Sequence, residues 1–104
     1  MISLKHDVEI NGIRPEIALA IAITHSVMIR RGWDLVVTSV RDGTHMEGSR
    51  HYSGCAFDVR TNFLKPEQIS LLRNELAGAL GPDFDVVIEP THCHVEFDRR
   101  GELR

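Results

Sequence analysis

The sequence predicts an α+β fold in which a small antiparallel sheet is covered on one face by two helices. Two segments with apolar residues at helical spacing alternate with pairs of short β-prone runs, in the order helix, strand, strand, helix, strand, strand. Strands that follow one another in pairs favour antiparallel neighbours with the helices packed on one side. No repeat, low-complexity stretch or linker divides the 104 residues, so we expect a single domain over residues 1–104.

Both predicted helices begin at a proline and are closed by a glycine. The first covers residues 15–31 and is followed by Gly32, and the second starts at Pro66 and is stopped by Gly81. Each carries one apolar stripe that is expected to face the core. The residues of the two stripes are Ile17, Ile21 and Met28 on the first helix and Ile69, Leu72, Leu76 and Leu80 on the second.

Four strands are expected between and after the helices. They are predicted at residues 35–40, 55–59, 84–90 and 92–97. The second strand carries one conspicuous charge, Asp58, in an otherwise apolar run. The third strand ends at Pro90, which separates it from the fourth.

Composition and charge exclude several classes of partner. The net charge of −3 gives no basic footprint for a nucleic acid or an anionic membrane surface. The richest apolar stretch, residues 17–23, is far too short to span a bilayer. No basic-then-apolar leader is visible, so we expect a protein that is made in the cytoplasm or is already mature. The sequence does not indicate an oligomeric state.

Two cysteines, Cys55 and Cys93, are too few for a disulfide framework. Each falls in a predicted strand at a position where a small apolar side chain would serve. We therefore interpret both as packing residues, with a disulfide or a metal ligand as the alternatives.

Six histidines in so short a chain draw attention to chemistry, and one segment pairs a histidine with a carboxylate. His51 ends a polar loop and precedes Asp58 by seven residues, with Gly54 allowing the chain to turn between them. Asp58 stands among apolar residues, where an unpaired ionised carboxylate is costly. It therefore needs a cation, a cluster of donors or a metal ion.

The second such segment is the predicted strand at residues 92–97. Alternate residues of a strand share a face, so His92, His94 and Glu96 are expected on one side. A histidine–aspartate pair plus one further histidine gives zinc three protein ligands and leaves one position for water. That ligand count is typical of a catalytic zinc site rather than a closed structural one.

The two segments together resemble the zinc D-alanyl-D-alanine carboxypeptidase family, which includes phage endolysins of the L-alanyl-D-glutamate type and shares its fold with the Hedgehog signalling domain. The resemblance covers residues 35–97, most of the chain. The pattern Ser-x-His-x-x-Gly-x-Ala-x-Asp is filled by Ser49, His51, Gly54, Ala56 and Asp58. The later motif, His-x-His followed by Glu, is matched by His92, His94 and Glu96, and an upstream Ser-x-Arg by Ser39 and Arg41.

The resemblance implies a role for each matching residue. One Zn²⁺ ion would be held by His51, Asp58 and His94. His92 would lie beside the ion and stabilise a developing oxyanion or steer a proton. Arg41 would hold the carboxylate or carbonyl of the substrate through its planar fork of donors, or else be a solvent-exposed strand end.

Two further matching residues have supporting roles. Ser49 would brace the loop that carries His51. Glu96 would hydrogen-bond to one of the metal ligands and so orient it, or else be exposed to solvent.

The general base is where the sequence departs from the family pattern. The family usually has Asp or Glu three residues before the last zinc ligand, and here that position is Thr91. The nearest acidic residue is Glu89, and a bend at Pro90 would bring it inward, so we expect Glu89 to act as the base. If Glu89 points to solvent, the domain would bind zinc and substrate with little or no turnover.

The resemblance therefore implies a zinc metallopeptidase that hydrolyses D,D or L,D peptide bonds in peptidoglycan stem peptides, as a carboxypeptidase or an endopeptidase. Such a phage-encoded or prophage-encoded protein would reach the wall through a partner's pore or as part of a virion. One alternative is a non-catalytic zinc-binding module that recognises a peptide or protein partner, which Thr91 favours. Another is a metal-free domain that uses its histidines for packing.

Overall fold

The computed structural model describes residues 2–6, 8, 13–40 and 56–98. Five strands and two helices lie in these ranges. In chain order they are β1 (Ile2–Leu4), α1 (Pro15–Ile29), β2 (Leu35–Ser39), β3 (Ala56–Arg60), α2 (Pro66–Leu80), β4 (Phe84–Ile88) and β5 (His92–Phe97).

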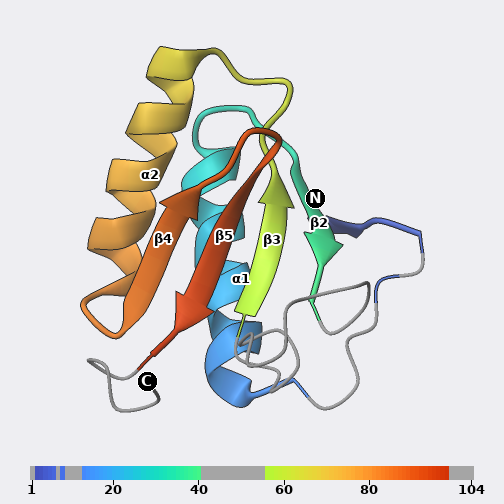
Figure 1. Ribbon diagram of the computed structural model, residues 1–104, viewed down its shortest axis with the longest axis vertical. Coiled ribbons are helices and arrows are strands. Elements are labelled where there is room, and N and C mark those ends of the chain that lie inside the picture. The colour runs from blue at the N-terminus through green and yellow to red at the C-terminus, as the bar shows by residue number, and fades with distance from the viewer. Residues whose placement is uncertain (1, 7, 9–12, 41–55, 99–104) are drawn as a thin grey trace.

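The strands form one mixed sheet with both helices packed against it. The strand order is β1-β2-β3-β5-β4, and the two helices lie together on one side of the sheet, behind it in Figure 1. The helices contact each other, and α2 also contacts β4 while α1 contacts β2. The predicted α+β class with two covering helices is confirmed.

The prediction of a wholly antiparallel sheet is wrong, because β1 runs parallel to β2. Ile2 pairs with Leu35 and Leu4 with Val37, whereas the pairs β2–β3, β3–β5 and β4–β5 are antiparallel as expected. A three-residue strand has too few residues for a readable alternation. Its partner lies about thirty residues further along the chain, so the pairing depends on tertiary contacts that local pattern does not encode.

The ends of the helices follow local chemistry. Each begins at a proline, whose fixed φ suits the first helical turn and whose missing N–H costs nothing there. Gly32 and Gly81 follow the two helices with φ of 75° and 90°, a conformation in which other residues are strained. The first helix ends at Ile29, two residues earlier than predicted, and residues 30–32 form the turn.

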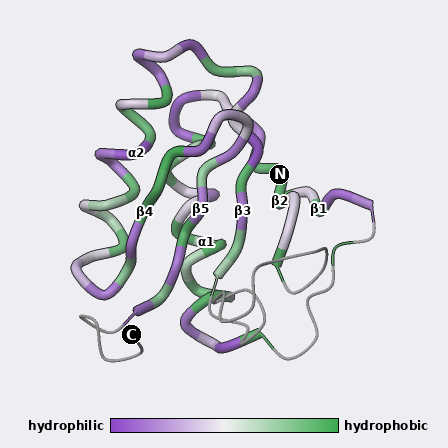
Figure 2. Tube along the Cα trace, in the orientation of Figure 1, coloured by the Kyte–Doolittle hydropathy of each residue, from purple (hydrophilic) through white to green (hydrophobic). Residues whose placement is uncertain are grey.

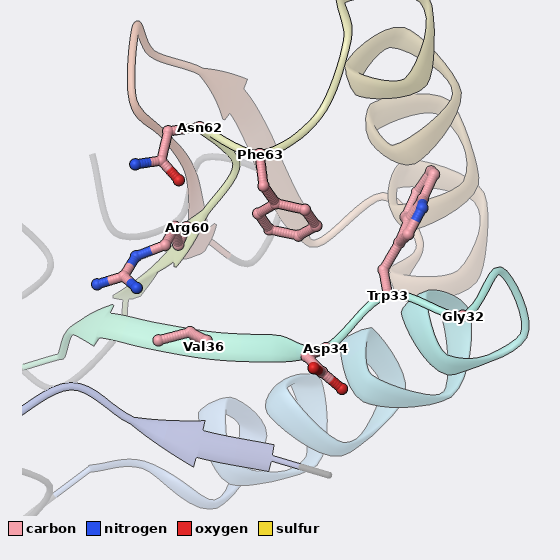
Figure 3. A pocket seen from close by; sticks show the side chains of 7 residues that line it. All are labelled: Gly32, Trp33, Asp34, Val36, Arg60, Asn62 and Phe63. Atoms are coloured by element: carbon pink, nitrogen blue, oxygen red, sulfur yellow. The ribbon is translucent and has the colours of Figure 1, made fainter.

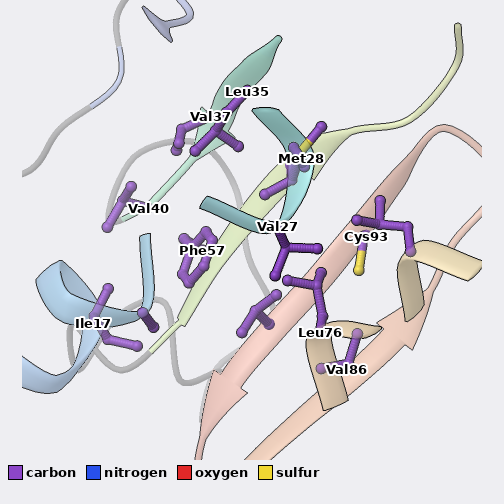
Figure 4. Close-up of a cluster of buried hydrophobic side chains, with 14 of the residues drawn as sticks. Ile17, Val27, Met28, Leu35, Val37, Val40, Phe57, Leu76, Val86 and Cys93 are labelled. Carbon is purple, nitrogen blue, oxygen red and sulfur yellow. The ribbon is translucent and has the colours of Figure 1, made fainter. Parts of the chain in front are cut away.

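The hydrophobic core lies between the helices and one face of the sheet. Phe57 is fully buried near the middle of the cluster in Figure 4. In Figure 2, hydrophobic and hydrophilic residues are interspersed along α2, as expected for a helix with one buried face. The buried cluster includes Ile17, Val27 and Met28 of α1, Leu72 and Leu76 of α2, and Leu35, Val37, Phe57, Val59, Cys93 and Val95 of the strands.

The opposite face of the sheet is polar along β3 and β5. Because side chains alternate along each strand, burying Phe57 and Val59 on the helix side turns Asp58 and Arg60 to the other side. None of the described helices is long and apolar enough to cross a membrane.

Candidate metal centre

Asp58 and His94 lie side by side on neighbouring strands. The antiparallel register of β3 and β5 places the Cα atom of Asp58 opposite that of His94. The Nδ1 atom of His94 is 3.0 Å from Oδ1 of Asp58. Asp58 is only 8% exposed, so its carboxylate depends on such partners to offset the loss of hydration.

The alternation predicted for β5 is confirmed. Cys93, Val95 and Phe97 are buried on the helix side, while His92, His94 and Glu96 are partly exposed on the other. The strand therefore brings two imidazoles and a carboxylate to the face that carries Asp58.

A β-bulge lies next to Asp58 on the other flank of β3. The β2–β3 register shifts between Val37 and Ser39, so that Val37 pairs with Val59 and Ser39 with Asp58. Bulges redirect side chains and are frequent beside functional sites. Ser39 of the Ser-x-Arg pattern is thus the strand partner of the candidate ligand.

His94 is held between two carboxylates. Its Nδ1 faces Asp58, and its Nε2 is 3.2 Å from Oε1 of Glu96. Burial alone would lower the pKa of His94, but the hydrogen bonds and negative charges of Asp58 and Glu96 raise the pKa above its usual value. A neutral imidazole carries a single N–H, so both contacts are favourable only if the ring is protonated or a cation lies at one of its nitrogens.

His92, two residues before His94 on the same face of β5, approaches the same aspartate. Its Nε2 lies 3.8 Å from Oδ2 of Asp58. Its Nδ1 is 3.3 Å from the Oγ1 hydroxyl of Thr91. Thr91 occupies the position where the family has an acidic residue. Its contact with Nδ1 orients the ring of His92 so that Nε2 faces Asp58.

Glu89 lies at the rim of the site rather than inside it. It directly follows β4, and its backbone N–H donates to the carbonyl oxygen of His92 at 2.9 Å. This bond places the two residues opposite each other across the hairpin. The Glu89 side chain is exposed, and among the described residues no hydrogen bond or ion pair joins it to Asp58, His92 or His94.

Two expected site residues, His51 and Arg41, lie outside the described residues. The same holds for Ser49 and Gly54 of the first motif. The structure thus brings together Asp58, His92 and His94 of the predicted set and leaves the third ligand and the substrate arginine as expectations.

An acidic group next to His94 was not anticipated. Ligand atoms of Asp85, Glu96 and Asp98 lie within 4.8 Å of one another. The sequence places Asp85 and Glu96 in two consecutive predicted strands. In the structure they are strand partners on β4 and β5. Clusters of this kind are common without a metal ion, and this one adds negative charge beside His94.

Cys93 is a packing residue, as the sequence analysis favoured. Its thiol is free and fully buried on the helix side of β5. Burial and the nearby charge of Asp58 raise the pKa of the Cys93 thiol to about 12. The thiol is therefore protonated at neutral pH and faces away from the imidazoles.

The donors at this place, imidazole nitrogen and carboxylate oxygen, are of the types that zinc accepts. Zinc accepts imidazole nitrogen and carboxylate oxygen at about 2.0–2.2 Å, so two donors of one tetrahedral ion lie roughly 3.3–3.6 Å apart. Nδ1 of His94 and Oδ1 of Asp58 are 3.0 Å apart, which is a hydrogen-bond distance, so a bound ion would require the two atoms to separate by roughly 0.3–0.6 Å. Glu96 at the other ring nitrogen is the kind of partner that orients metal-binding histidines.

We compared the chain with protein-family models, curated proteins and solved structures, and no match was found in any of the three. The motif resemblance and the geometry of the site are therefore the two sources of a functional proposal.

Proposed function

We propose that this protein is a zinc-dependent peptidase that hydrolyses peptide bonds of bacterial peptidoglycan. The observation that carries the proposal is the position of His94 between Asp58 and Glu96. A cation at Nδ1 satisfies both the imidazole and the buried carboxylate at neutral pH, while Glu96 accepts the Nε2 proton. The motif that supplies His51 and Asp58 supports the same reading.

The proposed ligands are His51, Asp58 and His94, which leave an open position on a four-coordinate ion. When bound there, zinc would supply Lewis acidity: it would polarise a carbonyl group and lower the pKa of coordinated water to near 7. Glu96 fixes the ring of His94, with its Oε1 3.2 Å from Nε2. Thr91 orients His92, whose Nε2 would stabilise negative charge that develops on the substrate carbonyl.

Proton transfer is assigned to Glu89. It lies opposite His92 across the hairpin, and its carboxylate would accept a proton from the attacking water and deliver it to the leaving amine. Arg41 would hold a carboxylate or carbonyl of the substrate. The stem peptide as substrate, cut at a D,D or an L,D bond, and a phage or prophage origin rest on the motif resemblance.

A second candidate is a zinc-binding module that recognises a peptide or protein partner without hydrolysis. Two observations favour it: Thr91 occupies the position where the family has an acid, and the side chain of Glu89 is exposed. Both candidates share the same ion and differ only in turnover.

The two candidates are separated by hydrolysis of purified peptidoglycan with zinc present. We expect wild-type protein to release new amino groups, and both Glu89→Ala and His51→Ala to lose this activity. Glu89→Ala should retain its zinc, whereas His51→Ala should not. Glu67→Ala removes an exposed carboxylate from the first turn of α2 and is the matched control with unchanged activity. One equivalent of bound zinc with no turnover on any wall fragment would contradict the peptidase and support the module.

A further inference from the structure

A pocket of about 400 Å³ opens where β2 begins and β3 ends, near the candidate metal centre. This volume lies within the range of small-molecule sites. In Figure 3, Arg60 and Asn62 lie on one side of the pocket, Trp33 lies on the other, and Phe63 is between them. Val36 of β2 also lines the pocket and lies below Arg60 in Figure 3. The pocket thus has a polar end and an aromatic end.

The polar end is next to the candidate metal centre. Arg60 follows Asp58 by two residues on β3, which puts the two on one face and about 6–7 Å apart along the strand. Arg60 is also the strand partner of His92 on β5. A ligand that reaches the metal centre across this face therefore passes the Arg60 side chain.

Arg60 carries a charge that the described part of the chain does not neutralise. Within residues 2–6, 8, 13–40 and 56–98, no ion pair or hydrogen bond of its guanidinium is found. The pocket also contains Asp34, but Figure 3 shows this carboxylate beyond Val36 and directed away from Arg60. A planar guanidinium with free donors matches a carboxylate in shape and charge.

The aromatic end is held in place before any ligand binds. The guanidinium of Arg31 lies 5.8 Å from the centre of the Trp33 ring, and Arg31 Nε donates to Oε1 of Glu75 at 2.8 Å. This chain of contacts ties the indole to α2. Phe63, by contrast, is 49% exposed, and an apolar group placed between the two rings would cover it.

We propose that this pocket is a carboxylate-binding subsite, in which Arg60 pairs with an acidic group of a peptide while Trp33 and Phe63 contact its apolar part. The carboxylate is either the free C-terminus of the peptide or an acidic side chain. The link to peptide hydrolysis rests on the proposed function, because it assumes that the same peptide extends to Asp58 and His94. Binding in the pocket does not require hydrolysis.

Trp33 is the single tryptophan of the chain, so its fluorescence reports on this pocket directly. The probes are N-acetyl-D-alanyl-D-alanine, the same dipeptide with a C-terminal amide, and N-acetyl-L-alanyl-D-glutamate amidated at its α-carboxyl and free at its γ-carboxyl. The full chain is titrated with each probe in the presence of zinc. We expect saturable binding of at least one carboxylate probe, with the amide at least about tenfold weaker. The stronger of the two acids identifies the source of the carboxylate.

Variants separate the pocket from the metal centre. Arg60→Gln should weaken binding of the preferred acid about tenfold and abolish its advantage over the amide. Arg30→Gln removes an exposed arginine at the end of α1 and should bind as wild type. Phe63→Ala should weaken the acid and the amide alike, whereas Leu71→Ala, a comparably exposed apolar residue of α2, should change neither.

The outcomes distinguish failure of this proposal from failure of the proposed function. Hydrolysis of peptidoglycan together with an Arg60→Gln variant that binds every probe like wild type overturns the subsite and leaves the peptidase. Acid-selective binding lost in Arg60→Gln, without hydrolysis, supports the subsite and contradicts the peptidase. A Trp33 signal that does not discriminate acid from amide in the wild type overturns the carboxylate assignment.

Discussion

The two faces of β5 belong to the same six residues, yet they have different physical roles. On one face Cys93, Val95 and Phe97 are buried against the helices. On the other, His94 contacts two carboxylates and remains partly exposed. Alternation along one strand therefore separates the side chains that stabilise the fold from those proposed to bind the metal ion. Substitutions on the apolar face should therefore mainly lower the free energy of unfolding, whereas substitutions on the polar face should mainly lower zinc affinity or activity.

The largest effect is expected on the apolar face of the neighbouring strand. Phe57 is fully buried near the middle of the core, so Phe57→Ala should lower the free energy of unfolding by about 3–5 kcal/mol, measured by urea denaturation of the zinc-free protein. Val87→Ala, at a 44% exposed position on β4, is the matched control and should cost less than about 1 kcal/mol. Equal losses in the two variants would mean that the faces are not separated as described.

On the polar face, a substitution of comparable size should instead lower the affinity for zinc. His94→Ala removes a proposed ligand and should weaken zinc affinity by at least about 100-fold, beyond the loss typical of outer partners. The unfolding free energy of the zinc-free variant should fall by about 1–3 kcal/mol, less than in Phe57→Ala, because the buried Asp58 carboxylate loses its 3.0 Å partner. Competition with a chromophoric chelator measures the affinity, with His25→Ala on α1 as the control. Unchanged affinity in His94→Ala would remove this histidine from the site.

Glu96→Gln tests the orientation of His94 and should have a smaller effect. The amide no longer accepts as a charged group, so we expect zinc affinity to fall about tenfold. Asp85→Asn removes a neighbouring charge on the same face without touching the 3.2 Å contact between Glu96 and His94. A similar loss in both variants would show that the negative field, and not the hydrogen bond, holds the ion.

The smallest effect is expected from Thr91→Val, which keeps the shape of the side chain and removes its hydroxyl. Loss of the 3.3 Å contact with Nδ1 of His92 should lower kcat several-fold, in line with about 0.5–1.5 kcal/mol for one hydrogen bond. Zinc content should not change. Steady-state hydrolysis of a wall fragment measures the effect, and Thr91→Ser should restore the rate. A Thr91→Ser variant as slow as Thr91→Val would exclude the hydroxyl as the cause.

The sequence predicted the face of β5 that carries His92, His94 and Glu96. Side chains alternate along a strand, so burial of Val95 on one face places these three residues on the other. It also predicted that Asp58 needs a partner, since its neighbours in the strand are apolar. It could not decide whether Glu96 contacts His94, because rotamers and not spacing determine that bond.

Other features required the three-dimensional register. The three residues of β1 pair in parallel with β2, which lies far along the chain. A local sequence pattern does not predict such a contact. The pocket at Arg60 joins residues from the turn after α1, from β2 and from the segment after β3. Its ends meet only because the antiparallel pairing of β2 and β3 brings them together.

Metal analysis tests most directly whether one zinc ion is bound at Asp58 and His94. Full-length protein supplemented with zinc and then freed of loosely bound metal is analysed by mass spectrometry of its metal content. We predict one equivalent of zinc in the wild type and none in the Asp58→Ala/His94→Ala double variant, with both proteins folded by circular dichroism. A wild type without zinc, or a double variant that retains a full equivalent, would contradict it.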